Sequence, residues 1–99
     1  MNESKYALKV DDLDNVATIF TNGITQGSEV EVIDKRGNSD RIIVNSNIPY
    51  GHKIAIKDIL PGENIIKYGE TIGRANCKIQ RGDYVHVHNL EAMRGRGDL

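Results

Sequence analysis

The chain has 99 residues, of which 38% are hydrophobic and 27% charged, and thirteen basic against fourteen acidic residues give a formal net charge of −1. This length suits one domain and excludes a cofactor-binding domain beside a separate substrate domain. The balanced charge argues against nucleic acid as a partner, because such proteins usually carry a basic excess. The sequence has neither a signal peptide nor an apolar run approaching the ~20 residues of a membrane span, so we expect a cytoplasmic protein with no membrane association.

The kinds of apolar residue predict a mainly β domain. Thirteen Ile and seven Val stand against five Leu and five Ala, and side chains branched at Cβ fit a pleated sheet better than a helix. Ten glycines supply the turns between many short strands. The single cysteine, Cys77, excludes an internal disulfide, and its Ile-rich surroundings suggest a small buried hydrophobe.

In chain order, the first half predicts strands at 6–10, 29–34 and 41–44, and one short helix at 11–23. Asp11 and Asp12 offer side-chain oxygens of the kind that begin helices. Apolar residues then follow at helical spacing, namely Leu13, Val16, Ala17 and Phe20. From Glu29 onward, charged and apolar residues alternate as in a strand with one wet face.

The second half predicts short strands near 53–56, 65–68, 74–78 and 84–88, separated by glycine turns. Residues 91–99 carry charge and glycine without periodicity. We therefore divide the chain into a domain at 1–90 and a flexible C-terminal tail at 91–99.

A short pattern, Ile-x-x-Gly-x-x-(Ile or Val), repeats along the chain. We identify copies at Ile24/Gly27/Val30, Ile59/Gly62/Ile65 and Ile79/Gly82/Val85. Each copy suggests a buried Ile, a tight turn whose glycine tolerates a positive φ, and a strand that returns to the core. An Ile-rich β domain could also produce such patterns by chance.

All three histidines lie in the second half, and two of them are spaced as neighbours on one strand face. In a strand over 84–88, His86 and His88 point to one side and Val85 and Val87 to the other. With His52 as the third ligand they would form an open metal site. The same residues could instead bind a carboxylate substrate, or simply occupy the solvent face of an edge strand.

A second group of candidate residues is Lys67-Tyr68-Gly69, with Lys53 as a further cation. A lysine ammonium and a tyrosine hydroxyl beside histidines suit an anionic ligand such as a sugar carboxylate. Alternatively, Lys67 and Tyr68 only end a strand before a turn.

These blocks together resemble one known family. Gly51-His52-Lys53-Ile54-Ala55-Ile56-Lys57-Asp58-Ile59, Ile66-Lys67-Tyr68-Gly69 and Val85-His86-Val87-His88-Asn89 are similar, in order and spacing, to the SAF module of the altronate and galactarate dehydratases. In that family the module is either the N-terminal part of a sugar-acid dehydratase or a separate small subunit.

The resemblance implies a β-clip fold of short bent strands and a lyase that removes water from a sugar acid to give a 2-keto-3-deoxy acid. It implies a divalent metal, iron(II) or manganese, in the holoenzyme, and a large catalytic subunit as partner. On this basis we expect His52, His86 and His88 as catalytic residues and possible metal ligands. Lys53, Lys67, Tyr68 and Asn89 are then expected to bind substrate, and the isolated chain is expected to be inactive.

Three alternatives stay open from the sequence. A related two-subunit enzyme of the family removes sulfite from a sulfonated hydroxy acid. SAF-like domains also serve as non-catalytic modules that bind ligands or partners. The third alternative is a structural dimer with solvated histidines, and an exposed sheet edge is compatible with such self-association into a homo-oligomer.

Overall fold

The computed structural model describes residues 5–92, and its regular structure within that range consists of β-strands. The strands are β1 (Tyr6–Lys9), β2 (Val16–Ile19), β3 (Glu29–Asp34), β4 (Ser39–Ile43), β5 (Lys53–Ala55), β6 (Asn64–Lys67), β7 (Glu70–Ala75), β8 (Tyr84–Val85) and β9 (Leu90–Ala92). The prediction of a mainly β, SAF-like fold of short strands is confirmed.

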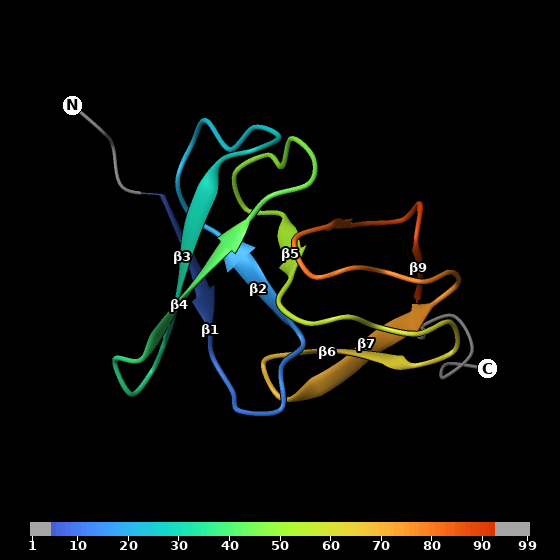
Figure 1. Ribbon diagram of the computed structural model, residues 1–99. Helices are drawn as coiled ribbons and strands as arrows, with labels where there is room; N and C mark the ends of the chain where they lie inside the picture. Colours follow the sequence, from blue (N-terminus) through green and yellow to red (C-terminus); the bar gives the residue numbers. More distant parts are fainter. Residues whose placement is uncertain (1–4, 93–99) are drawn as a thin grey trace.

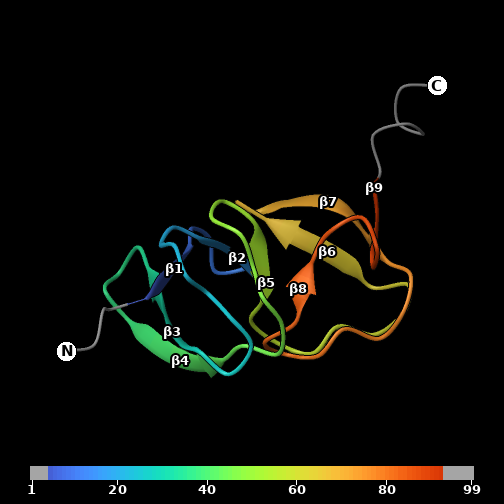
Figure 2. The same ribbon diagram turned by 90° about the horizontal axis from the view of Figure 1, so that it is seen from above.

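The strands form two sheets that meet in the middle of the molecule. A six-stranded sheet has the order β4-β3-β1-β2-β5-β8, and a three-stranded sheet has the order β6-β7-β9. All strand pairs are antiparallel except β1 with β3. Figures 1 and 2 show β1, β3 and β4 at one end, the second sheet at the other, and β5 between them.

Each end of the molecule has its own apolar core. The first core lies among β1 to β5 and includes Ile19, Val30 and Ile54. The second core lies where β2, β5 and β8 meet β6 and β7, and it includes Ile59, Ile65, Ile79 and Val85. Strand β5 contributes to both, because neighbouring residues of a strand face opposite sides.

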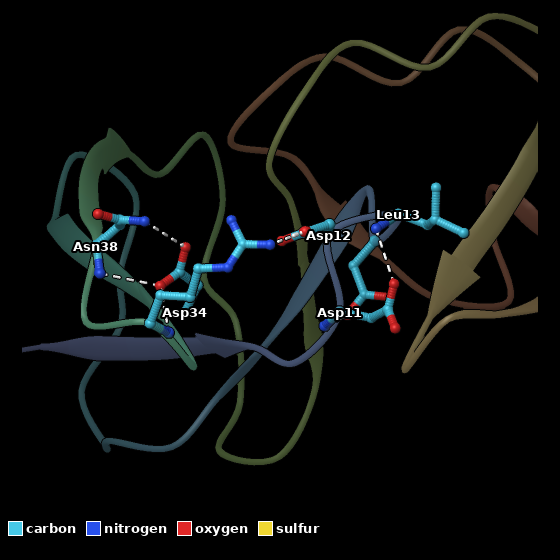
Figure 3. Close-up of polar contacts among 7 residues, drawn as sticks. Asp11, Asp12, Leu13, Asp34 and Asn38 are labelled. Atoms are coloured by element: carbon cyan, nitrogen blue, oxygen red, sulfur yellow. Dashed lines mark hydrogen bonds and ion pairs between the residues drawn. The ribbon is translucent and has the colours of Figure 1, made fainter.

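The helix predicted for 11–23 is wrong, because this segment holds a turn and the central strand β2. Within that turn the backbone N–H of Leu13 donates to Asp11 Oδ1 at 2.9 Å, as Figure 3 shows, and the N–H of Asp14 donates to the Asp11 carbonyl at 3.0 Å. The Asp11 signal was therefore that of a turn and not of a helix cap.

The apolar residues of strand β2 have a helix-like spacing in the sequence because both faces of the strand are buried. Val16 belongs to the second core and Ala17 to the first. A strand buried on both faces loses its alternation, and its apolar run can match helical spacing by accident. Leu13 and Phe20, the outer members of the expected helical stripe, are 64% and 41% exposed.

Strands β3 and β4 form the predicted hairpin, and the Asp34 carboxylate stabilises the turn between them. Asp34 Oδ1 accepts the backbone N–H groups of Arg36 and Asn38, each at 2.9 Å. The Asn38 side chain donates a further hydrogen bond to Asp34 Oδ2. The Arg36 guanidinium forms an ion pair with Asp12, which lies in the turn after β1 (Figure 3).

The repeated Ile-x-x-Gly pattern has the structure that its residues predict. In all three copies both branched residues are buried, with exposures of 0–3%, and the glycines have φ between 87° and 97°. A fourth copy lies at Ile48, Gly51 and Ile54, with the same burial and a glycine φ of 84°. The copies pair two by two, through isolated bridges between Ile24 and Ile48 and between Ile59 and Ile79.

Three of the four repeat turns are closed by the side chain that follows the glycine. Ser28 Oγ accepts the N–H of Thr25 at 3.1 Å. Glu63 Oε1 accepts the N–H of Leu60 at 2.7 Å. Asp83 Oδ2 accepts the N–H of Gln80 at 2.8 Å. In the fourth copy the corresponding residues are His52 and Pro49, and proline has no N–H to donate.

We expect Glu63→Ala to lower the free energy of unfolding by about 1 kcal/mol, because a turn N–H then loses its carboxylate acceptor. Glu63→Gln keeps an acceptor oxygen and should recover most of the loss. Urea unfolding followed by circular dichroism measures both. Equal loss in the two variants would contradict the assigned contact.

Three further expectations need correction. Strand β7 runs over Glu70–Ala75, not 74–78, because it forms a tight hairpin with β6. Cys77 is exposed instead of buried, since it lies after β7 has ended. Strand β9 pairs Glu91 and Ala92 with β7, so regular structure continues past residue 90. The rest of the predicted tail, 93–99, lies outside the described residues.

Candidate functional site

The candidate site lies where β5 and β8 pair at the centre of the molecule (Figure 2). His52 immediately precedes β5, and Tyr84 begins β8 opposite Ile54. The chain then turns at once, and this turn carries His86 and His88. The strand pairing thus brings residues 52 and 84–88 together although they are far apart in the sequence.

Four aromatic rings form the site, which we call the imidazole cluster: His52, Tyr84, His86 and His88. The Tyr84 hydroxyl lies 2.6 Å from His52 Nδ1, within hydrogen-bonding distance. The rings of His52 and His86 have centroids 4.9 Å apart. The Tyr84 ring stacks on His86 and meets His88 edge to face, with centroids 5.5 Å apart in both pairs.

The predicted strand over 84–88 is wrong after Val85, because the chain turns at residues 86–89. Asn89 Oδ1 accepts the N–H of His86 at 3.0 Å, and Asn89 Nδ2 donates to the Tyr84 carbonyl at 2.9 Å. Val85 is fully buried while Val87 is 76% exposed, so these two do not share a face. Both histidines nevertheless contact the Tyr84 ring. Asn89 is buried and uses its amide to hold this turn.

Two lysines complete the surroundings of the cluster. Lys53, next to His52, has its pKa lowered by burial and further by the charge of Lys67. Lys67 at the end of β6 therefore lies close enough to Lys53 for their charges to repel. Together the lysines and imidazoles form a site that favours an anion.

Tyr68 occupies a strained turn at the tip of the β6–β7 hairpin. Its φ is 56°, the one positive φ of a non-glycine residue in the described range, and Gly69 follows with φ 78°. Buried Asp14 fixes this turn, since its Oδ1 accepts the Gly69 N–H at 2.8 Å. The Tyr68 ring is exposed and lies 4.8 Å from Lys67 Nζ. Strain of this kind concentrates at functional sites.

We expect Tyr68→Asn to stabilise the isolated chain by roughly 0.5–1 kcal/mol, because asparagine tolerates a positive φ much better than tyrosine. A thermal melt measures the effect. Tyr68→Phe keeps the strain and should leave the melting temperature nearly unchanged. A lower melting temperature for the Asn variant would show that tyrosine contributes more through its contacts than it costs in strain.

The pKa of His86 lies below its usual value, first because of desolvation and then because of His52, Lys53 and His88 nearby. The direction of this shift favours the neutral imidazole. The unfolded chain binds this proton more readily, so the shift makes the fold less stable as the pH falls through about 6.5.

We expect His86 to titrate below 6.5 in the isolated chain, and Lys53→Gln to move its pKa upward by removing one positive neighbour. Nuclear magnetic resonance of the imidazole C–H groups measures both values. Lys78→Gln, on the exposed segment after β7, is the matched control. An unchanged His86 pKa in Lys53→Gln would show that Lys53 does not act on this ring.

The histidines do not form the three-ligand metal site that the sequence suggested. Within residues 5–92, no three His, Cys, Asp or Glu side chains are placed to hold one ion. The physical reason is that the Tyr84 hydroxyl engages His52 Nδ1 while the other two rings pack against the Tyr84 ring. We therefore derive no step through a metal on this chain.

Sequence reasoning missed Tyr84, which contacts all three histidines. A usable signal was present, because Lys53 and Tyr84 occupy the same position, two residues after the glycine, in two copies of the repeat and each begins a strand. Pairing of these two strands places Tyr84 opposite Ile54, next to the segment that carries His52.

Comparisons with known proteins found a matching family and several relatives. Residues 5–93 match the family described as the altronate/galactarate dehydratase SAF domain. The chain is 38% identical over 82 residues to altronate dehydratase of Escherichia coli strain K12, covering 83% of the chain but 15% of that protein. It is 37% identical over 86 residues to (2R)-sulfolactate sulfo-lyase subunit alpha of Chromohalobacter salexigens, covering 82% of the chain and 87% of that subunit.

A further relative is galactarate dehydratase (L-threo-forming) of Escherichia coli strain K12, 38% identical over 81 residues, which make up 81% of the chain and 14% of that enzyme. The match therefore spans about a seventh of each of these two dehydratases. Within residues 5–92, no helix of the length and apolarity needed to cross a membrane is present.

Proposed function

The chain belongs to the family of altronate/galactarate dehydratase SAF domains, and from this premise we propose that it is the small subunit of a lyase acting on hydroxylated sugar acids. In this proposal it completes or covers the active site of a large catalytic subunit. The imidazole cluster carries the proposal, because it presents three histidines on one surface beside two lysines. A sugar acid is an anion, and such a surface suits its carboxylate.

The proposed reaction removes water from the substrate and leaves a 2-keto-3-deoxy acid. It requires a base for the proton next to the carboxylate and stabilisation of the negative charge that develops there. We assign charge stabilisation and substrate orientation to His52, His86, Lys53 and Lys67, with Tyr68 at the rim. Asn89 supports the turn that carries His86 and His88. The base and any divalent metal, such as iron(II) or manganese, belong in this proposal to the large subunit.

A second substrate class has one specific observation in its favour. The chain matches 87% of the length of the sulfo-lyase alpha subunit, against about a seventh of the two dehydratases. We therefore include loss of sulfite from a sulfonated hydroxy acid as the alternative reaction. The two reactions share the developing charge beside a carboxylate, so the same residues serve in both.

The test is reconstitution with a candidate large lyase subunit from the same genome. Co-expressed chains should purify as a complex and release either water from altronate or galactarate, or sulfite from sulfolactate, while the isolated small chain does neither. A complex that forms but converts none of these acids would leave only the non-catalytic binding role. Failure to form any complex would refute the subunit proposal.

A further inference from the structure

The turn that carries His52 departs from the other three repeat turns in a way that concerns function. In those three, the residue after the glycine is an acceptor that closes its own turn: Ser28, Glu63 or Asp83. Pro49 removes the donor from the fourth turn. His52 therefore has no capping bond to make, and its ring is available for another partner.

That partner is the Tyr84 hydroxyl, 2.6 Å from His52 Nδ1. The Tyr84 ring is held firmly, because it packs on the first core and against His86. Its backbone carbonyl is also bonded by the Asn89 amide. The hydroxyl is consequently a fixed group on a rigid element, and the His52 side chain beside it is partly exposed.

The direction of this hydrogen bond sets which nitrogen of His52 carries the proton. A phenol O–H is a good donor and a neutral imidazole nitrogen a good acceptor, so we assign Tyr84 as the donor and Nδ1 as the acceptor. The ring proton then resides on Nε2. The hydrogen bond made by one ring nitrogen in this way determines the state of the other.

We propose that Tyr84 is a positioning residue that holds neutral His52 in its Nε2–H tautomer, so that His52 donates a hydrogen bond to a carboxylate or developing oxyanion of the substrate. A neutral imidazole donor stabilises such charge without delivering its proton. The substrate part of this inference rests on the proposed function, whereas the tautomer does not.

The tautomer is measured by nuclear magnetic resonance of the isolated chain labelled with ¹⁵N-histidine, at a pH where the rings are neutral. In the wild type we expect His52 to show a protonated Nε2 and an unprotonated Nδ1. In Tyr84→Phe, which keeps the packed ring, a detectable share of the Nδ1–H form should appear. Tyr50→Phe, at an exposed tyrosine of the same turn, is the control and should change nothing.

Two results would overturn the inference: Nδ1–H for His52 in the wild type, or identical ¹⁵N frequencies in the wild type and Tyr84→Phe. In the reconstituted enzyme, Tyr84→Phe should lower kcat by roughly 10- to 100-fold with a smaller change in KM. An unchanged kcat with the expected tautomer shift would remove the substrate part of the proposal. If the enzyme cannot be reconstituted, the tautomer result still decides the role of Tyr84.

Discussion

His52→Ala should lower the turnover of the reconstituted enzyme by about 10²- to 10⁴-fold, the range typical for loss of one positioned polar group at a reacting centre. The reason is that His52 is a partly exposed member of the imidazole cluster and is hydrogen-bonded to Tyr84. The isolated variant should remain folded, because the repeat turn at Pro49 does not use this side chain as a cap.

The repeat provides the matched control for His52→Ala. Glu63 occupies the equivalent position in another copy and caps its own turn. Glu63→Ala should therefore lose stability but retain turnover, whereas His52→Ala should lose turnover but retain most of its stability. The assay is product formation at saturating substrate, with circular dichroism for the fold. Wild-type turnover in His52→Ala would exclude this histidine from the reaction.

Much of the fold could be predicted because each copy of the repeat determines its turn through residues that are close together in the sequence. A branched residue, a glycine at positive φ and a second branched residue specify a turn that returns the chain to the core. Glu29–Asp34 alternates in sequence and forms β3 with the same bounds. The segment at Val16 could not be predicted, because its strand is covered on both faces and the covering elements come from distant parts of the chain.

The sequence indicated that the three histidines would lie close together, but it did not indicate Tyr84 or the arrangement of the rings. His52, His86 and His88 do gather at one place, yet they do so around Tyr84 and not around a metal position. The position of the turn after Val85 depends on the Asn89 amide bonding back to the backbone, and such a bond is not visible as periodicity. Pro49 is the sequence feature that distinguishes the turn before His52 from the other three copies.

The same repeat also joins the two halves of the molecule, through Gly82. Its carbonyl accepts the Asn45 N–H at 2.9 Å, and its N–H donates to the Ala55 carbonyl at 2.8 Å. A Cβ added at Gly82 would lie 2.5 Å from the Ile43 carbonyl oxygen and 3.2 Å from Asn45 Nδ2. Glycine is thus required at this position for two reasons, namely its φ of 97° and the close approach of the Ile43 carbonyl oxygen.

Gly82→Ala should accordingly destabilise the chain far more than Gly62→Ala. Gly62 has φ 87° and nothing within 4 Å of an added Cβ, so its substitution measures the backbone strain alone, about 1–2 kcal/mol. Gly82→Ala adds a clash with backbone and should cost roughly a further 2 kcal/mol, or about 10 °C in Tm. Thermal melts of the two variants measure the difference. Equal melting temperatures would mean that the segment from Ile43 to Asn45 can move away from the added methyl group without loss of stability. The two halves would then not be held together at this glycine.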